Sequence, residues 1–262
     1  MDFNELGLTG PILKGIASQN YDKPTPIQNA VIPKFLNNHD IVGIAQTGTG
    51  KTAAFVLPIL ERLIKKSKKN SPKSFPFLIL VPTRELAMQI IDKIRAYGKI
   101  IRPKAVLIVG GAKPGPQIKS LKDGADIVVA TPGRLLDHVK SKAAYLNTTN
   151  TVILDEADQM LDLGFMPSIK LIMSNISKTK QAVLLSATMP KAVRSLANEF
   201  LNELGEYSYK NKTTVQDAKW YKAEPIWVTA RKQQMVTASY FWVGSEAPIK
   251  GLYPNYYYKY DN

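Results

Sequence analysis

The feature that most constrains the fold is a glycine-rich octapeptide between an apolar run and a helical pattern. The octapeptide reads Ala45-Gln46-Thr47-Gly48-Thr49-Gly50-Lys51-Thr52; it follows Ile41-Val42-Gly43-Ile44 and precedes Ala53-Ala54-Phe55-Val56-Leu57. A strand, a glycine-rich loop and a helix in this order cradle phosphate, because the N–H groups and the dipole of a helix N-terminus attract anions. Lys51 can reach the β and γ phosphates, and the Thr52 hydroxyl can bind Mg²⁺. The general pattern begins with Gly where this chain has Ala45, and the surrounding order of elements supports the prediction of a nucleotide site.

A second apolar run ends in a pair of carboxylates. Thr151-Val152-Ile153-Leu154 is followed by Asp155-Glu156-Ala157-Asp158. A strand that delivers carboxylates at its C-terminal end suits a nucleotide site, with Asp155 holding Mg²⁺ through water and Glu156 orienting and deprotonating an attacking water. The alternative is an acidic helix start, because Asp and Glu are favourable in a first turn.

Strand-like runs alternate with helical patterns over the first three quarters of the chain. The runs are Ile41–Ala45, Phe77–Val81, Ala105–Val109, Ile127–Ala130, Thr151–Asp155 and Gln181–Ser186. Continuous apolar strands separated by helices are typical of a parallel sheet that is covered on both faces. The sequence therefore predicts an α/β domain over residues 1–204, with a single doubly wound parallel sheet and helices on both faces.

Composition narrows the range of partners and sites. The formal net charge of +14 favours polyanions. The absence of cysteine excludes disulfides and thiolate metal sites, and His39 and His138 stand in separate segments where we expect surface positions. The basic run 65–73 is interpreted as a solvated loop, with RNA contact as the alternative. With no signal peptide visible and no apolar run of about 18 residues, we expect no membrane span and a cytoplasmic location.

Seven short motifs together resemble the first RecA-like domain of DEAD-box RNA helicases over about residues 1–204. In chain order they are Pro24-Thr25-Pro26-Ile27-Gln28, the octapeptide, Pro82-Thr83-Arg84-Glu85-Leu86-Ala87, Gly110-Gly111, Thr131-Pro132-Gly133-Arg134, Asp155-Glu156-Ala157-Asp158 and Ser186-Ala187-Thr188. The resemblance implies ATP-dependent RNA helicase activity, with ATP and Mg²⁺ as cofactors and RNA as the partner. The family usually has Gly before the aromatic residue at Tyr21, where this chain has Asn20.

The resemblance also implies that Gln28 reads the nucleotide base, with Phe3 packing near it. A terminal amide pairs bidentately with the N6/N7 edge of adenine, so ATP is expected in preference to GTP. The resemblance further implies that Ser186 and Thr188 hydrogen-bond Asp158 and couple the state of the bound nucleotide to RNA binding. Thr188 also fits a helix N-cap.

Six further residues follow predicted strands: Thr83, Arg84, Gly110, Gly111, Thr131 and Arg134. Ligands of open parallel sheets bind at the carboxyl ends of the strands. Small hydroxyls, helix N-termini and arginines there suit phosphate and 2′-OH contacts, and the resemblance implies an RNA backbone track with little sequence specificity. The alternative is structural: the two threonines fit helix N-caps, and the two arginines fit surface ion pairs.

The tail, residues 205–262, has a different character. It holds nine of the twelve tyrosines and all three tryptophans and shows no strand–helix alternation, and we expect it to be poorly ordered. Residues 218–233, 240–246 and 251–254 resemble a fragment of type I phosphodiesterase/nucleotide pyrophosphatases. Such enzymes need zinc held by Asp and His, and the tail has no His, so no metal site is carried over. We interpret the chain as a fusion of two truncated coding regions.

Three functions remain open at this point. The first is an ATP-dependent RNA helicase truncated to its ATP-binding half, which a second RecA-like domain would complete in trans. The resemblance implies an arginine finger from that domain, and a missing finger costs ~10³–10⁵ in rate. The second is a non-catalytic nucleotide- and RNA-binding fragment, and the third is a phosphodiesterase formed by the tail.

Overall fold

A computed structural model of the chain describes residues 2–19, 21–64, 70–177 and 179–201, and the backbone of 238–239 and 256–257. Contacts divide the chain into two compact units, Met1–Glu203 and Leu204–Asn262. In the second unit, β7 (Ala238–Ser239) pairs in parallel with β8 (Tyr256–Tyr257). The expected poor order of the tail and its phosphodiesterase resemblance otherwise concern residues outside the described ones.

The first unit contains the six predicted strands. They are β1 (Ile41–Ile44), β2 (Phe77–Leu80), β3 (Ala105–Ile108), β4 (Ile127–Ala130), β5 (Thr151–Leu154) and β6 (Gln181–Ser186). Four predicted ranges ran one residue too far at the C-terminal end. Three of these extra residues still join the sheet by one bond, since the N–H groups of Ala45, Val81 and Asp155 donate to strand carbonyls at 3.0 Å.

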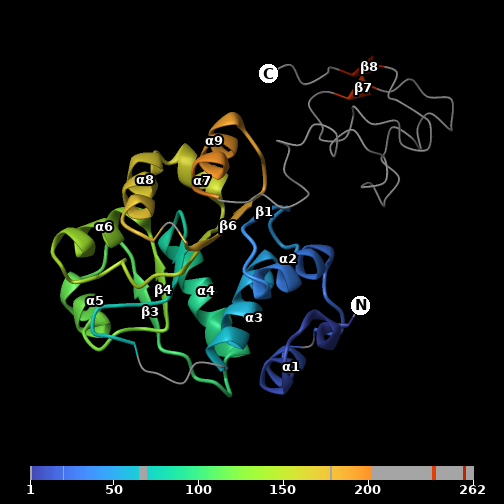
Figure 1. Ribbon diagram of the computed structural model, residues 1–262, viewed down its shortest axis with the longest axis horizontal. Helices are drawn as coiled ribbons and strands as arrows, with labels where there is room; N and C mark the ends of the chain where they lie inside the picture. The colour runs from blue at the N-terminus through green and yellow to red at the C-terminus, as the bar shows by residue number, and fades with distance from the viewer. Residues whose placement is uncertain are drawn as a thin grey trace. The chain divides into compact units, whose positions relative to one another are not determined.

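All six strands are parallel and form one sheet in the order β1-β6-β5-β2-β4-β3 (Figure 1). The register aligns their carboxyl ends: Leu80 lies beside both Ala130 and Leu154, and Ile44 lies beside Ser186. The predicted fold class, a doubly wound parallel α/β sheet, is confirmed. Every loop that leaves a strand therefore starts from the same edge of the sheet.

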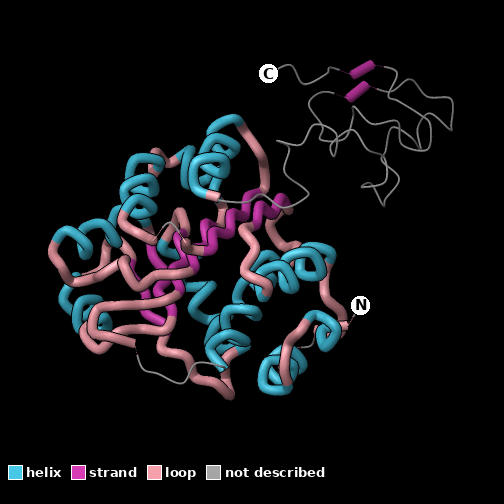
Figure 2. The backbone as a smooth tube through the Cα atoms, in the orientation of Figure 1, coloured by secondary structure: helices cyan, strands magenta, loops and turns pink. Residues whose placement is uncertain are grey.

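Helices cover the sheet on both faces (Figure 1, Figure 2). Right-handed crossovers place α3 and α4 on one face and the helices after β3 on the other. No helix in the described ranges is long and apolar enough to cross a membrane. The helices are η1 (Phe3–Leu6), α1 (Gly10–Ala17), α2 (Pro26–Leu36), α3 (Lys51–Ile64), α4 (Arg84–Tyr97), α5 (Pro114–Leu121), α6 (Pro132–Lys140), α7 (Ala157–Asp162), α8 (Met166–Ser174) and α9 (Lys191–Phe200).

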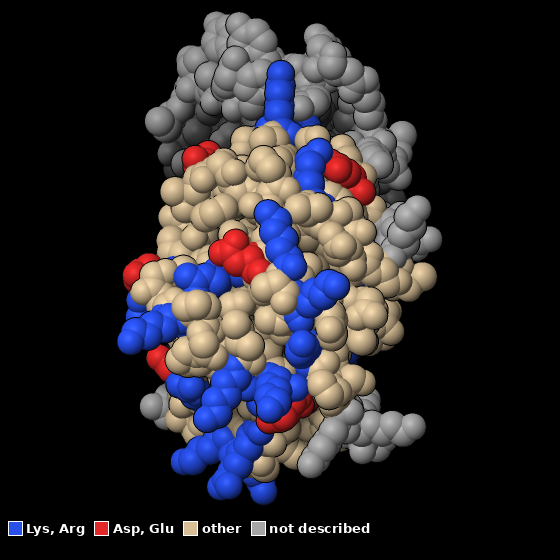
Figure 3. Space-filling view, turned by 90° about the vertical axis from the view of Figure 1, so that its left-hand side faces the viewer, with Lys and Arg blue, Asp and Glu red and all other residues tan. Residues whose placement is uncertain are grey.

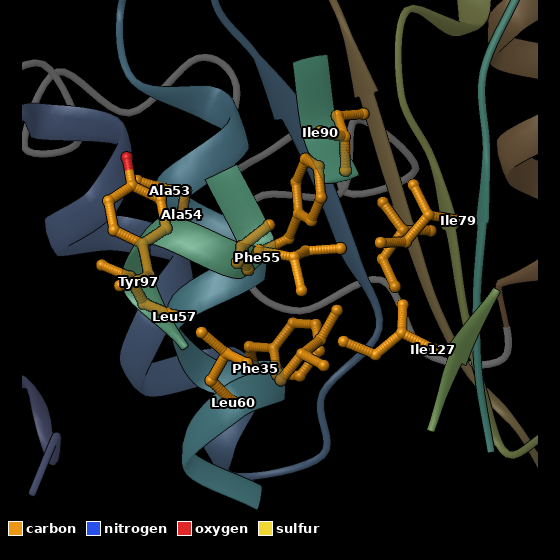
Figure 4. Packing of buried hydrophobic residues seen from close by; sticks show 14 of the residues in the cluster. Phe35, Ala53, Ala54, Phe55, Leu57, Leu60, Ile79, Ile90, Tyr97 and Ile127 are labelled. Atoms are coloured by element: carbon orange, nitrogen blue, oxygen red, sulfur yellow. The ribbon is translucent and has the colours of Figure 1, made fainter. Parts of the chain in front are cut away.

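A cluster of buried apolar residues lies between the sheet and helices α1 to α4. Alternate strand residues point into it, such as Ile79 and Ile127, and they meet Phe55 of α3 and Ile90 of α4 (Figure 4). The intervening residues, such as Leu78, are equally buried. Burial on both faces explains why the strands read as continuous apolar runs in the sequence.

Arg62 lies near the C-terminal end of α3 and connects this helix with its neighbours. Its Nη1 donates to Gln181 Oε1 at 2.9 Å, its Nη2 donates to the Phe35 carbonyl, and its guanidinium lies 4.6 Å from the centre of the Phe35 ring. Gln181 Nε2 donates in turn to the carbonyls of Phe35 and His39. This network fixes α2 and α3 to the amino end of β6, and burial lowers the pKa of Arg62 to about 10.

The two histidines differ in their surroundings. His39 is exposed, as expected, but the expected surface position of His138 is wrong, because only 2% of that residue is exposed. His138 follows Leu135 by three residues in α6 and therefore shares its buried face. Its Nε2 lies 3.2 Å from Gln117 Oε1, and Gln117 Nε2 donates to the Val109 carbonyl. Burial, with a smaller contribution from the Arg134 charge, lowers the pKa of His138.

Two glycines of α1 give a matched test of helix packing. A Cβ on Gly15 would lie 2.3 Å from the Tyr97 carbonyl oxygen, whereas a Cβ on Gly10 meets nothing within 4 Å. Gly15→Ala should lower the free energy of unfolding by roughly 1–3 kcal/mol, because α1 must move off α4. Gly10→Ala should leave it unchanged or raise it by up to about 1 kcal/mol. Urea denaturation measures both, and equal effects at the two positions would contradict this packing.

The buried histidine predicts a pH dependence of stability. In the unfolded chain His138 protonates near pH ~6.5, whereas the folded protein resists its protonation. The unfolded state therefore binds more protons below about pH 6.5, and stability should fall as the pH is lowered. His138→Gln should reduce the stability difference between about pH 7.5 and about pH 5.5, and the exposed His39→Gln should not. An unchanged difference in the His138 variant would show that the imidazole is not protected.

Candidate functional site

The sheet order brings together three segments that are far apart in the sequence. The octapeptide follows β1, Asp155–Asp158 follows β5, and Ser186–Thr188 ends β6, which lies between the other two strands. The Ala45 N–H donates to the Ser186 carbonyl at 3.0 Å. The predicted phosphate loop, carboxylates and coupling hydroxyls therefore meet at the carboxyl edge of the sheet, where α/β proteins bind ligands.

The octapeptide forms a tight loop at the start of α3. Gly48 and Gly50 have φ angles of +87° and +92°, which lie in the left-handed region that glycine adopts without strain. A Cβ on Gly50 would lie 2.4 Å from Gln28 Nε2. Thr49 Oγ1 donates to the Gln46 carbonyl at 2.7 Å. Backbone conformation and close approach both require glycine at position 50.

Lys51 occupies the first position of α3, and its ammonium is unsatisfied. The residue is 6% exposed, and its Nζ is buried and donates to none of the described groups. A buried ammonium without partners is costly. An anionic ligand at the loop would satisfy it, so the residues present fit a phosphate group. Thr52 follows on the same turn and is half-buried.

Asp155 is the most deeply buried carboxylate of the candidate site, with 2% exposed. Burial raises the pKa of Asp155 to about 7, although nearby Lys51 acts in the opposite direction. Glu156 has a left-handed backbone with φ of +53°, and its N–H donates to Asp155 Oδ1 at 3.0 Å. The acidic-helix-start alternative describes Asp158, which lies in the first turn of α7, but does not describe the buried Asp155.

The predicted contacts between Asp158 and the end of β6 are present. Thr188 N–H and Oγ1 both donate to Asp158 Oδ2, at 2.9 and 2.7 Å, and the Asp158 N–H donates to Ser186 Oγ at 3.2 Å. Partial burial acts to raise the pKa of Asp158, but these bonds outweigh it and hold that pKa below its ordinary value. Thr188 is not the N-cap of α9, since Pro190 occupies that position.

The donor set also fits Mg²⁺ bound together with phosphates. The described residues contain no group of three or more His, Cys, Asp or Glu side chains that could hold a metal ion. Nucleotide-bound Mg²⁺ does not need such a group, because it keeps several waters and takes one or two protein oxygens besides the phosphates. Thr52 and Asp155 are oxygen donors of this kind.

Gln28 contacts the phosphate loop directly. The residue is 4% exposed; its Oε1 accepts the Thr25 N–H at 3.0 Å, and its Nε2 donates to the Gly50 carbonyl at 3.2 Å. Phe3 is buried in the apolar cluster with residues of α2. Sequence reasoning missed Thr25, whose buried Oγ1 has no partner among the described residues beside the loop. The spacing Thr25-x-x-Gln28 of a capping box was the available signal.

The six residues of the predicted RNA track lie at the carboxyl ends of β2, β4 and β3, which are neighbours in the sheet. Arg134 Nη1 donates to the Ala112 carbonyl at 2.8 Å, so the segments after β3 and β4 are joined. A Cβ on Gly111 would lie 3.8 Å from Arg84 Nη1. The track residues therefore form one continuous edge, on which Gly110, Gly111 and Arg84 are exposed.

The structural alternatives for the track hold in part. Thr83 Oγ1 accepts the Leu86 N–H at 3.2 Å and caps α4, whereas Thr131 occupies the N-cap position of α6 without such a bond. Arg134 Nε lies 3.8 Å from Asp137 Oδ2, and this ion pair is weak because the distance is long and the carboxylate is exposed. The N-cap role of Thr83 leaves the rest of this edge open for a ligand.

A DEAD/DEAH box helicase family model matches residues 25–219. The chain is 41% identical over 210 residues to the DEAD-box ATP-dependent RNA helicase CshA of Bacillus subtilis, covering 80% of this chain and 42% of the relative. It is 39% identical over 235 residues to the ATP-dependent RNA helicase DeaD of Escherichia coli K12, covering 89% of this chain and 37% of the relative.

Solved structures agree with these matches. The DEAD box protein of Methanococcus jannaschii has a TM-score of 0.72 and 43% identity, over 78% of this chain and 54% of that one. The chain spans less than half the length of the two curated relatives. The family model, the curated relatives and the fold agree, and the chain belongs to the DEAD/DEAH box helicase family.

Proposed function

We propose that the domain formed by residues 1–204 binds ATP with Mg²⁺ and the backbone of RNA, as the ATP-binding half of an ATP-dependent RNA helicase. The observation that carries this proposal is the buried Lys51 ammonium, unsatisfied by the described residues, next to a loop with two left-handed glycines. The names of the relatives, ATP-dependent RNA helicases, support the choice of ligand and reaction.

Each residue of the nucleotide site has a distinct task. Lys51 binds the β and γ phosphates, and Thr52 and Asp155 hold Mg²⁺, directly or through water. When bound, Mg²⁺ neutralises charge on the phosphates. The pKa of about 7 means that Asp155 is partly protonated near neutral pH, and a facing cation favours its ionised form.

Glu156 orients and deprotonates the attacking water. Its left-handed backbone turns the chain sharply between β5 and α7, and the bond from its N–H to Asp155 Oδ1 fixes that turn. Left-handed non-glycine residues are strained and cluster at active sites. The strain at Glu156 therefore agrees with a catalytic position.

Gln28 retains hydrogen-bonding capacity for the base. A terminal amide has two N–H donors and an oxygen with two lone pairs, and the contacts with Thr25 and Gly50 use one of each. The remaining donor and acceptor match the adenine edge. Gln28 thus connects base recognition with the conformation of the phosphate loop.

RNA binds along the edge formed by the residues after β2, β3 and β4, through its phosphates and 2′-hydroxyls. Asp158 ties the segment after β5 to Ser186 and Thr188, so a shift of one segment is passed to the other. A second RecA-like domain, supplied in trans, completes the cleft with an arginine finger. A non-catalytic nucleotide- and RNA-binding module is the second candidate, because the residues proposed to bind nucleotide and RNA lie in this domain whereas the arginine finger would come from the second one.

Nucleotide choice is the first test. ATP·Mg²⁺ should bind more tightly than GTP·Mg²⁺, and Gln28→Ala should remove the preference. Lys51→Ala should weaken ATP binding by about 10–100-fold, because a charge-assisted bond to phosphate is worth roughly 1.5–3 kcal/mol. Lys170→Ala, at an exposed position on α8, is the control. Titration with fluorescent analogues of ATP and GTP measures the affinities of the wild type and of the three variants. Equal affinity of the wild type for the two nucleotides would contradict base reading by Gln28.

Turnover separates the two candidate functions. The chain alone should release phosphate slowly, and addition of a second RecA-like domain with RNA should raise the rate by ~10³-fold or more. Glu156→Gln should abolish that turnover and retain ATP binding. Steady-state phosphate release with and without RNA makes the measurement. If the added domain gives no turnover while ATP and RNA still bind, the non-catalytic module is the better description.

A further inference from the structure

Four lysines lie near the amino ends of β2, β3 and β4, at the edge of the sheet opposite the proposed RNA track. They form what we call the basal lysine cluster, made of Lys73, Lys104, Lys122 and Lys142. Lys104 directly precedes β3, Lys73 and Lys122 lie in the segments that lead into β2 and β4, and Lys142 follows α6. Lys73 Nζ donates to the Lys142 carbonyl at 3.0 Å.

Backbone hydrogen bonds hold these segments together. The Lys73 N–H donates to the Leu121 carbonyl beside Lys122, at 3.1 Å. The Asp126 N–H, at the start of β4, donates to the Lys104 carbonyl at 2.8 Å. The four lysines are therefore placed by the sheet and its adjoining loops as one group.

The cluster presents positive charge to solvent. Lys104, Lys122 and Lys142 are exposed and Lys73 is half-buried. Figure 3 shows lysine and arginine side chains gathering toward the lower end of the face it displays. Asp123 is exposed beside them, and Asp126 already accepts bonds from the Lys104 N–H and from Asn70. The four lysines have two carboxylates beside them, and Asp126 is already hydrogen-bonded to its neighbours. The cluster therefore has an excess of positive charge.

The backbone at two of the lysines is strained. Lys73 and Lys142 have φ angles of +58° and +56°. Glycine and asparagine adopt this left-handed region more readily than lysine does. Glycine or asparagine would adopt the backbone conformation at positions 73 and 142 with less strain than lysine. Residues that are kept in spite of such strain are often functional.

The position of the cluster relative to the proposed RNA track suggests one ligand for both. The track occupies the carboxyl ends of β2, β3 and β4, and the cluster surrounds their amino ends. From Asp126 to Thr131 the chain advances about 17 Å at ~3.3 Å per residue. An RNA that extends about this far beyond the track reaches the cluster.

We propose that the basal lysine cluster is a second contact for the RNA backbone, and that it binds the RNA segment flanking the track. This inference rests on the proposed RNA track. Exposed lysines bind phosphates without reading bases, so the cluster adds affinity and salt dependence without adding sequence specificity.

A neutral variant and a matched control test the inference. The neutral variant carries Lys73→Asn, Lys104→Gln, Lys122→Gln and Lys142→Asn, in which asparagine suits the two left-handed positions. The control removes four exposed lysines elsewhere, Lys14→Gln, Lys23→Gln, Lys170→Gln and Lys191→Gln. Both variants have the same net charge, and thermal unfolding verifies that both remain folded.

Binding is measured with a single-stranded RNA of about 6 nucleotides, which is within the size of one single-strand site, and with one of about 20 nucleotides, which extends well beyond such a site. The neutral variant should bind the short RNA like the wild type and the long RNA on the order of tenfold more weakly at low salt. For the long RNA, its slope of log affinity against log salt should be shallower by about 0.7 for each phosphate that the variant no longer neutralises. The control should show a smaller loss of affinity that is similar for both RNAs.

Equal behaviour of the neutral variant and the control on the long RNA would overturn the inference. So would unchanged RNA binding together with a loss of binding to an acidic peptide or to vesicles of anionic lipid. Arg84→Gln with Arg134→Gln tests the track separately. If this pair leaves short-RNA binding intact while the neutral variant still binds the long RNA more weakly, the proposed track is wrong; the cluster is then an RNA contact, but not one that flanks the track.

Discussion

The site depends on one constraint: six parallel strands in register, of which the inner four are buried on both faces. Because all strands run in the same direction, their carboxyl ends form one edge, and the loops that carry chemistry start there. The pairing of Ile44 with Ser186, and of Leu154 with Leu184, sets the octapeptide, Ser186 and Asp155 side by side. A one-residue slip of β6 would reverse the face to which each of its side chains points and remove Ser186 from Asp158.

The same edge concentrates features that oppose stability. Lys51 has a buried ammonium that the described residues leave unsatisfied, Asp155 has a buried carboxyl with a raised pKa, and Glu156 has a left-handed backbone. Each is unfavourable in the nucleotide-free protein. Burial of the apolar cluster between the sheet and α1 to α4 offsets these unfavourable contributions to the folding free energy. Binding of an anion together with a cation would relieve those of Lys51 and Asp155. Proteins commonly accept such local conflicts where they bind ligands.

The sequence contained enough information for the sheet and for the segments that meet at its carboxyl edge. Runs such as Thr151–Leu154 are apolar because both faces of the sheet are covered, and that pattern is visible in the chain itself. The left-handed turn at Glu156, the bonds of Gln28 to Thr25 and Gly50, and the burial of His138 were not predicted. Each of these arises from contacts between segments far apart in the sequence, or from backbone geometry that no residue type specifies. Thr25 is the exception, because its capping-box spacing with Gln28 could have been recognised.

The central claim is that the site is held in a state that is costly until a ligand binds, and the stability of the nucleotide-free protein tests it most directly. Lys51→Met keeps the length of the side chain and removes its charge. At about pH 6, where a pKa of about 7 leaves Asp155 mostly protonated, that carboxyl supplies little negative charge to the ammonium. Urea denaturation without nucleotide should then show Lys51→Met to be more stable than the wild type by about 1–3 kcal/mol, the desolvation penalty of an unsatisfied buried polar group. A Lys51→Met protein that is less stable than the wild type under these conditions would show that the ammonium stabilises the empty loop, which contradicts the claim.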